Sequence, residues 1–245
     1  MRMRRFRFIP FFIASLFIGW ISLSGFASAA IANATLEEQV IQIILDHPEV
    51  LIESVQSYQK RKRQESKQKQ QALLQEITTY PVSLIGNSPT TGAVGKKIVL
   101  LEFSDFQCPF CAQAESTLKE FMAQHQDLVT LVYKHFPLTQ IHSYAQSAAE
   151  AAWAAQQQGK FWPYHDALFE QQKELGEDLY LAIAQSLNLD LEQFNRDRHS
   201  LAAKAAINSD IELAEQVGIR GTPFFALNGQ VLSLPLQISA MEDLL

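Results

Sequence analysis

A pair of cysteines three residues apart constrains this chain more than any other feature. Cys108 and Cys111 are the only two cysteines in 245 residues. They follow an apolar run at residues 98–103, which is typical of a buried strand. Pro109 lies between them, and proline favours the first position of a helix. The pattern therefore predicts a strand, then a helix that begins at Cys108 and carries Cys111 one turn inside.

A cysteine at a helix N-terminus has a defined chemistry. The free N–H groups and the positive end of the helix dipole stabilise a thiolate there. Such a thiol has a lowered pKa, and the thiolate is the species that attacks disulfides. The spacing of Cys108 and Cys111 therefore indicates a dithiol that cycles through a disulfide.

Other uses of two cysteines fit less well. A bridge that closes so short a loop constrains the unfolded chain little, so a purely structural disulfide is a weak explanation. A zinc site needs more ligands, and no histidine pair with metal-ligand spacing lies near the CxxC. We expect no metal and no cofactor, although two thiolates can hold Cu(I) and a two-coordinate copper site stays open as an alternative.

The N-terminus has the three-part pattern of a secretory signal. Four arginines come first, then an apolar stretch from about residue 8 to 23, then small residues up to Ala29 and Ala30. We expect a signal peptide at residues 1–29, cleaved after Ala29, and a periplasmic or otherwise exported protein; an uncleaved membrane anchor is the alternative. Removal of residues 1–29 changes the formal charge from −6 to −10, which argues against nucleic acid as a partner.

Residues 30–85 are predicted to form an N-terminal helical extension and linker. The helical pattern covers residues 35–77, with one break at Asp46-His47-Pro48. An apolar stripe runs through residues 36–58, whereas residues 60–71 contain no apolar residue and are typical of a solvated helix. The stripe either packs back on the rest of the chain or pairs with other copies in a homo-oligomer.

The remaining pattern alternates strands with helices. Residues 98–103, 109–125 and 129–136 predict a strand, a helix and a second parallel strand. Mostly helical pattern follows over residues 143–217. We further expect a linker at 80–97, a turn at Thr222-Pro223, a hairpin of strands 224–227 and 230–234 joined by Asn228-Gly229, and a last helix at 238–245.

Four segments of this chain together resemble exported DsbA-like disulfide oxidoreductases. They are LEFSDFQCPFC at residues 101–111, YKHFP at 133–137, GKFWPYHDALF at 159–169 and GIRGTPF at 218–224. The resemblance implies an α/β, thioredoxin-like fold with an inserted helical block and an N-terminal helical extension. It places the DsbA-like domain at residues 86–245, with the helical insertion at about 140–217.

The resemblance also implies roles for individual residues. Cys108 is the exposed attacking thiol and Cys111 is the shielded resolving thiol. Glu102 matches a buried acid that relays the proton of the inner cysteine, with Lys134 as a candidate partner. Pro223 matches a cis-proline, whose loop faces the CxxC and binds an extended client. The expected client-binding residues are Pro109, Phe110, Thr222 and Pro223.

One residue departs from the family pattern. Strongly oxidising members have histidine where this chain has Phe110, and a phenyl ring cannot donate a hydrogen bond to the Cys108 thiolate. The protein is therefore expected to be less oxidising than those members. We expect net oxidation of cysteine-containing client proteins through a mixed disulfide, with a redox partner protein that resets the disulfide. An oligomeric isomerase, a reductant, and a holdase or copper-binding protein without turnover are the alternatives.

Overall fold

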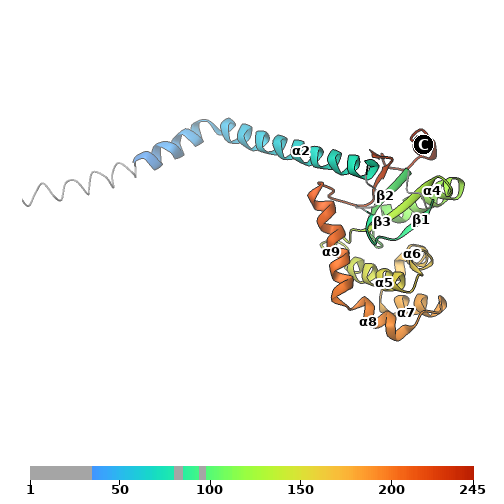
Figure 1. The fold of residues 1–245 in the computed structure, drawn as a ribbon. Coiled ribbons are helices and arrows are strands. Elements are labelled where there is room, and N and C mark those ends of the chain that lie inside the picture. Colours follow the sequence, from blue (N-terminus) through green and yellow to red (C-terminus); the bar gives the residue numbers. More distant parts are fainter. Residues whose placement is uncertain (1–34, 80–84, 94–97) are drawn as a thin grey trace, which may run out of the picture. The chain divides into compact units, whose positions relative to one another are not determined.

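The computed structural model describes residues 35–79, 85–93 and 98–245 (Figure 1). The predicted signal peptide at residues 1–29 lies outside these ranges. The chain divides into two compact units, up to Lys62 and from Arg63 onward. The domain boundaries expected from the sequence stay a prediction.

The N-terminal unit is helical, as the pattern predicts. One helix covers residues 35–46, and α2 (Pro48–Thr79) begins after His47. The break therefore falls at the predicted Asp46-His47-Pro48. None of the helices that the structure describes is long and apolar enough to cross a bilayer. Large apolar side chains are exposed on these helices: Leu36, Val40, Ile41, Ile43, Ile44, Leu45, Val50, Leu51, Ile52, Val55 and Tyr58.

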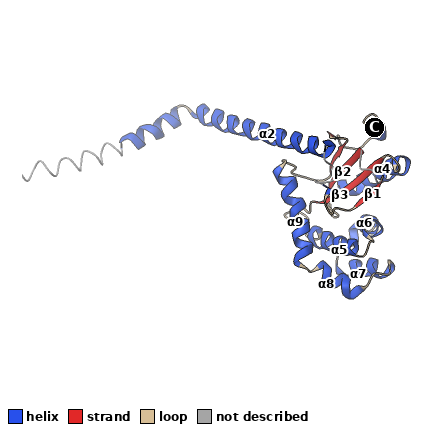
Figure 2. Ribbon diagram, viewed as in Figure 1, coloured by secondary structure: helices blue, strands red, loops and turns tan. Residues whose placement is uncertain are grey.

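A five-stranded sheet forms the centre of the second unit (Figure 2). Its spatial order is β1-β3-β2-β4-β5, and only β2 and β3 run parallel. Helix α4 (Pro109–His125) connects these two strands, so the predicted strand–helix–strand unit is confirmed. The strands are β1 (Thr90–Gly92), β2 (Ile98–Ser104), β3 (Val129–His135), β4 (Phe224–Leu227) and β5 (Gln230–Val231).

Strand β1 corrects the expectation of a linker over residues 80–97. It pairs antiparallel with β3, and Thr90 lies opposite Val132. Its sequence, Thr-Thr-Gly, is too short to show an alternating pattern. Gly92 has φ +89°, and a Cβ there would collide with the Val129 carbonyl oxygen. Glycine therefore allows the close approach of this edge strand to β3.

Alternating side chains give the sheet two different faces. Val99, Leu101 and Phe103 of β2 share a core cluster with residues of α9 (Leu201–Gln216). Leu100 points the other way and packs with α4 and α10 (Ile238–Glu242). Every even-numbered residue of β2 therefore lies on the α4 face, below the helix that carries the cysteines.

The segment between β3 and β4 is a helical block, as expected. Its first helix, α5, is buried through its alanines, and Asp190 caps α8 by accepting a hydrogen bond from the Gln193 backbone N–H at 2.9 Å. The predicted α/β, thioredoxin-like fold with a helical insertion is confirmed. The remaining elements are α5 (Ala145–Gln157), α6 (Phe161–Glu170), the 3₁₀ helix η1 (Gln172–Glu174), α7 (Glu177–Ser186) and α8 (Leu191–Arg198).

Candidate active site

Helix α4 begins at the cysteine pair. Cys108 is the N-cap residue, with extended backbone angles φ −72° and ψ 120°, and Pro109 is the first helical residue. The Cys108 carbonyl accepts hydrogen bonds from the backbone N–H groups of Cys111 and Ala112, at 3.1 and 3.2 Å. Both cysteines are free thiols. The helix start predicted from the sequence is confirmed.

Both cysteines are buried, which corrects the expectation that Cys108 is exposed. The exposed fraction is 3% for Cys108 and 0% for Cys111. The Cys108 sulfur lies 3.4 Å from the carbonyl oxygen of Thr222. Gln172 donates a side-chain hydrogen bond to the Cys108 carbonyl at 3.0 Å. These two covering residues are 114 and 64 positions away in the chain, so local sequence pattern could not place them there.

The two thiols have opposite acidities. The pKa of Cys108 is lowered from near 9 to about 5, chiefly because the Cys111 side chain donates a hydrogen bond to its sulfur. Burial opposes this shift of the Cys108 pKa, whereas Thr222 and two backbone N–H groups of α4 add to it. Burial, and then its donor role toward Cys108, raise the pKa of Cys111 far above its ordinary value. At neutral pH the pair therefore holds one thiolate, on Cys108, and one proton, on Cys111.

The loop before β4 contains a cis peptide bond between Thr222 and Pro223, in agreement with the resemblance. Pro223 is buried and Thr222 is half-buried. The Thr222 hydroxyl has no hydrogen-bond partner among the described residues, and it lies close enough to Cys108 to lower the pKa of that thiol. The loop therefore presents both a carbonyl and a hydroxyl to the sulfur.

The other two residues expected at the client side lie on the surface. Pro109 is exposed, and Phe110 has 64% of its surface exposed. A phenyl ring carries a large apolar surface, and its burial against a partner is favourable. Phe110 therefore offers an apolar contact next to the buried Cys108 sulfur.

Glu102 is fully buried on the α4 face of the sheet. Its neighbour across the parallel pair is Tyr133. Neither carboxyl oxygen has a hydrogen-bond partner in the described part of the chain. Burial raises the pKa of Glu102 from 4.5 to about 7, and a contact with the Ser104 side chain lowers it slightly.

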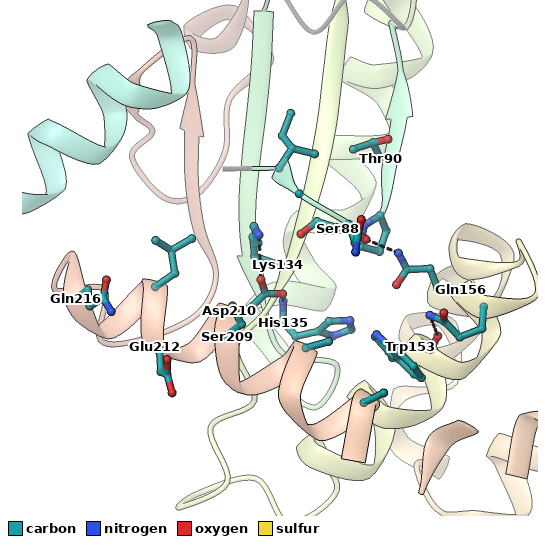
Figure 3. Close-up of a pocket in the computed structure, with 18 residues that line it drawn as sticks. Ser88, Thr90, Lys134, His135, Trp153, Gln156, Ser209, Asp210, Glu212 and Gln216 are labelled. Carbon is teal, nitrogen blue, oxygen red and sulfur yellow. Dashed lines mark hydrogen bonds and ion pairs between the residues drawn. The ribbon is translucent and has the colours of Figure 1, made fainter. Parts of the chain in front are cut away.

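Lys134 does not pair with Glu102, which corrects that expectation. It follows Tyr133 in β3 and so points to the opposite face. There its Nζ lies 2.9 Å from Asp210 Oδ1, and the backbone N–H of His135 donates to Asp210 Oδ2 at 3.0 Å (Figure 3). Asp210 thus accepts a hydrogen bond from the edge of β3 at His135, beyond the residues of β3 that pair with β1.

A second buried acid and a histidine lie close to Glu102. Its carboxylate, the carboxylate of Glu115 on α4 and the imidazole of His165 on α6 offer ligand atoms within 4.8 Å of one another, a group that could hold a metal ion. Burial, and then the charge of Glu102, raise the pKa of Glu115 to about 7. Sequence reasoning gave Glu115 and His165 no role. In the sequence, each of the two is marked only as a polar residue on the inner face of a predicted helix.

Comparison with known proteins decides the family. A family model described as a DSBA-like thioredoxin domain matches residues 99–243. This chain belongs to that family. Its members are thiol–disulfide oxidoreductases with a CxxC pair, so the class expected from the sequence is confirmed.

The curated relatives that this chain matches are larger proteins. The chain is 39% identical over 145 residues to the Na(+)/H(+) antiporter NhaA 3 of Salinispora tropica, which is 59% of this chain and 22% of that protein. It is 33% identical over 141 residues to the antiporter NhaA of Herminiimonas arsenicoxydans, again 22% of that protein. The chain thus spans about a fifth of the length of these relatives. The antiport activity in their names is a property of those larger proteins.

Solved structures share the DsbA-like fold over most of their length. A thioredoxin-like oxidoreductase from Silicibacter pomeroyi is 31% identical, with a TM-score of 0.60 over 66% of this chain and 93% of that one. The ScsC protein of Proteus mirabilis is 23% identical, with a TM-score of 0.60 over 88% of this chain and 95% of that one. A periplasmic thioredoxin-like protein from Salmonella enterica has a TM-score of 0.57 at 21% identity.

Proposed function

We propose that this chain is an exported oxidoreductase that oxidises the thiols of client proteins. The observation that carries the proposal is the split acidity of the pair, with a Cys108 pKa of about 5. Stabilising the thiolate stabilises the reduced protein, and this makes the corresponding disulfide a stronger oxidant. The phenyl ring of Phe110 supplies no hydrogen bond, but the Cys111 side chain and the backbone N–H groups of Phe110 and Cys111 lower the pKa of Cys108, and Thr222 adds to this shift.

The reaction is a two-step exchange that starts from a Cys108–Cys111 disulfide. A client thiolate attacks the Cys108 sulfur, the S–S bond breaks, and Cys111 leaves as a thiolate that takes up a proton. A second client thiolate then attacks the client sulfur of the mixed disulfide, and Cys108 leaves as its stable thiolate. The client loses two electrons and gains a disulfide, while the protein gains both electrons as a dithiol. A redox partner protein then reoxidises the pair.

Glu102 is the proposed proton donor to Cys111 in the first step and the proton acceptor on reoxidation. A pKa of about 7 leaves the carboxyl group partly protonated at neutral pH, as this exchange requires. Ser104 lies on the same face of β2 as Glu102, and its side chain lowers the pKa of both Glu102 and Cys111.

Client binding is proposed along the surface beside Cys108. Phe110 and Pro109 give the apolar part, and the loop at Thr222 and Pro223 gives backbone groups to an extended peptide. Main-chain hydrogen bonds select little among side chains, so such a site suits varied cysteine-containing clients. Export is supported by the N-terminal signal pattern, and the exported compartment would keep the pair oxidised.

Trapping of the intermediate tests the proposal. The Cys111→Ser protein is first joined through Cys108 to a small thiol compound as a mixed disulfide. A reduced, cysteine-containing peptide should then take over this compound in a disulfide of its own and release the Cys108 thiolate. The Cys108→Ser protein should be inactive. Equilibration with graded glutathione buffers should give a midpoint above about −180 mV for an oxidant. A midpoint near or below about −270 mV would instead show a reductant.

A second function is favoured by one feature of the N-terminal unit. Its helices expose a long series of apolar side chains, which include Val40, Leu51 and Val55. If this surface pairs with other copies, several active sites belong to one particle, an arrangement that suits isomerisation of misfolded clients. Reactivation of a client with scrambled disulfides, measured against simple oxidation of a reduced client, separates the two functions.

A further inference from the structure

The turn between β2 and α4 is held by polar side chains from separate segments of the chain. This turn, residues 105–108, brings Cys108 to the start of α4. Within the turn, the Cys108 N–H donates a hydrogen bond to the Asp105 carbonyl at 3.0 Å. Further hydrogen bonds join the turn to the loop between β3 and α5 and to η1. The backbone next to Cys108 is therefore fixed to parts of the fold that lie far away along the chain.

Asp105 carries a carboxylate with no exposed surface. Its Oδ1 accepts a hydrogen bond from the Gln107 N–H at 2.7 Å, and its Oδ2 accepts one from the Leu138 N–H at 2.8 Å. His142 Nδ1 lies 2.7 Å from the same Oδ2, and this ring nitrogen is the donor. The side chains of Asp105 and His142 are 0% and 16% exposed. Three donors therefore hold this carboxylate and tie the turn to the loop after β3.

Gln172 holds the same turn from the helical block. Its side-chain amide donates to the carbonyl oxygen of Phe106 at 2.8 Å and to that of Cys108 at 3.0 Å. An amide nitrogen carries two hydrogens, so both bonds form at once. The Cys108 carbonyl also accepts the N–H groups of Cys111 and Ala112. Both peptide groups of Cys108 are therefore fixed, and its sulfur keeps only the rotation about the Cα–Cβ bond.

Stability alone is a weak reason for this arrangement. A buried carboxylate loses its hydration, and a buried ion pair often adds nothing to stability compared with apolar residues of similar volume. Hydrogen bonds have directions, however, whereas an apolar contact would let the turn shift. Direction matters at Cys108, because a thiolate gains from N–H donors only when they point at the sulfur.

We propose that Asp105, His142 and Gln172 form a brace that holds this turn and so positions the Cys108 sulfur at the start of α4. The three are positioning residues, since they act on the sulfur through the backbone of the turn. The inference rests on the proposed function, in which Cys108 leaves the mixed disulfide as a thiolate. A loosened turn would move the sulfur away from its donors and make Cys108 a poorer leaving group.

The causes of the lowered Cys108 pKa agree with this role. The hydrogen bond from the Cys111 side chain comes first, and burial opposes it. Thr222 and the backbone N–H groups of Cys111 and Phe110 lower the pKa of Cys108 further. All of these favourable contacts are short-range, so a displacement of the sulfur weakens them together.

Other titratable groups lie around the turn on several elements. They are Glu102 on β2, Glu115 on α4, and Tyr133 and His135 on β3 with His165 on α6, whose rings lie 5.4, 6.2 and 5.6 Å from the Phe106 ring. Variants of His142 and Gln172 leave all of these groups in place. A change in the titration of Cys108 in such variants therefore reports on the brace.

Titration of the Cys108 thiol in the reduced protein tests the brace. The rate of Cys108 alkylation by iodoacetamide is measured from about pH 4 to pH 10 in the wild-type protein, in Gln172→Met and in His142→Leu. Neither methionine nor leucine donates a hydrogen bond from its side chain. We expect the midpoint of the titration to rise by about one pH unit in each variant, because hydrogen bonds that favour the thiolate are weakened. Release of an oxidised client from Cys108 should slow about threefold.

Two control variants separate hydrogen bonding from charge and from side-chain size. His142→Asn places an amide nitrogen near the position of Nδ1, so it keeps a donor to Asp105 without a positive charge. It should keep the wild-type midpoint. Gln171→Met removes the neighbouring amide, which donates to the Ala167 carbonyl in α6 at 3.4 Å, and it should also leave the midpoint unchanged.

The brace is overturned if Gln172→Met and His142→Leu keep the wild-type midpoint. It is also overturned if His142→Asn shifts the midpoint as far as His142→Leu does, because the charge of the ring would then be the cause. Should His142→Leu not fold, Gln172→Met decides the question, since it replaces an uncharged, half-buried side chain. A wild-type midpoint near 9, the ordinary value of a thiol, would instead refute the split acidity on which the proposed function rests.

Discussion

The acidity of Cys108 can be measured directly on the reduced protein. Its pKa is held near 5 by the Cys111 hydrogen bond, Thr222 and the backbone of α4, whereas an ordinary thiol titrates near 9. The rate of alkylation by iodoacetamide should therefore increase as the pH rises through 5 and be nearly constant from about pH 7 upward. Mass spectrometry should find the label on Cys108 and not on Cys111. A rate that keeps rising through pH 9 would contradict this prediction.

The same pKa has a consequence for stability. Between pH 5 and 9 the unfolded reduced protein binds more protons at Cys108 than the folded protein does, so folded stability rises with pH in that window. This contribution is complete above about pH 9 and is lost as the pH falls through about 5. The oxidised protein lacks the thiolate. Its urea unfolding, compared with that of the reduced protein across this range, isolates the effect.

Glu102 should trade stability for activity. Its folded pKa of about 7 lies above its ordinary value of 4.5, so the buried carboxylate costs stability as the pH rises through this window, and the full cost remains above pH 7. The free energy of unfolding of Glu102→Gln, measured in urea at pH 8, should therefore exceed that of the wild-type protein by about 3 kcal/mol. Its client oxidation should be about a hundredfold slower. Glu120→Gln, at an exposed position of α4, is the control and should change neither quantity.

At the scale of the elements, the edge of β3 depends on one ion pair. Lys134 and Asp210 are 7% and 11% exposed at their side chains and lie 2.9 Å apart. Asp210→Asn keeps an acceptor for the His135 N–H but leaves the Lys134 ammonium buried and unpaired. We expect a loss of about 3 kcal/mol in the free energy of unfolding.

A second variant separates the charge from the packing. Adding Lys134→Met to Asp210→Asn removes the unpaired charge and should recover most of the lost stability in urea unfolding. Asp197→Asn serves as a control, because its partner Arg196 is 70% exposed and the pair lies 3.8 Å apart. That change should lower the free energy of unfolding by less than about 0.5 kcal/mol. Equal losses from both aspartates would contradict the role of burial.

Local pattern predicted most elements because their signals are local. Helix α4 follows the predicted bounds Pro109–His125, since proline marks its start and apolar residues recur along one face. α5 likewise covers Ala145–Gln157, as its alanines predict. The strand β1 was missed because three residues give no periodicity. It is held by pairing with β3, about 40 positions later in the chain, which no local window contains.

The candidate site, like the fold, was predicted from the sequence only in part. The cysteine pair was evident from spacing, and Glu102 came only with the resemblance to a family. The partners of these residues come from distant segments of the chain. Thr222 contacts the Cys108 sulfur, and His165 lies close to Glu115 from another helix. Asp210 accepts a hydrogen bond from Lys134. Pairing of charged side chains depends on which face each strand residue occupies, and the register was not available from the sequence.

At the scale of the whole molecule, the N-terminal unit has an apolar surface over residues 36–58 that nothing within this unit buries. Its large side chains are exposed on two consecutive helices, whereas apolar residues on the α4 face of the sheet are buried. Apolar surface of this extent is a common mark of association between proteins. Self-association would bury it, and a hydrophobic gain of roughly 1.5–3 kcal/mol per large side chain would favour the assembly.

Light scattering on the protein from residue 30 onward tests this hypothesis. We expect the wild-type mass to be a multiple of the chain mass, and the double variant Ile43→Glu, Val55→Glu to have the mass of one chain, because buried carboxylates would oppose association. Leu201→Glu is the control: Leu201 is equally apolar and 84% exposed, but it begins α9 in the other unit and should leave the mass unchanged. If the double variant keeps oxidising a reduced client but loses reactivation of a scrambled one, association serves isomerisation. A single-chain mass for the wild-type protein at every concentration would refute self-association and leave net oxidation as the function.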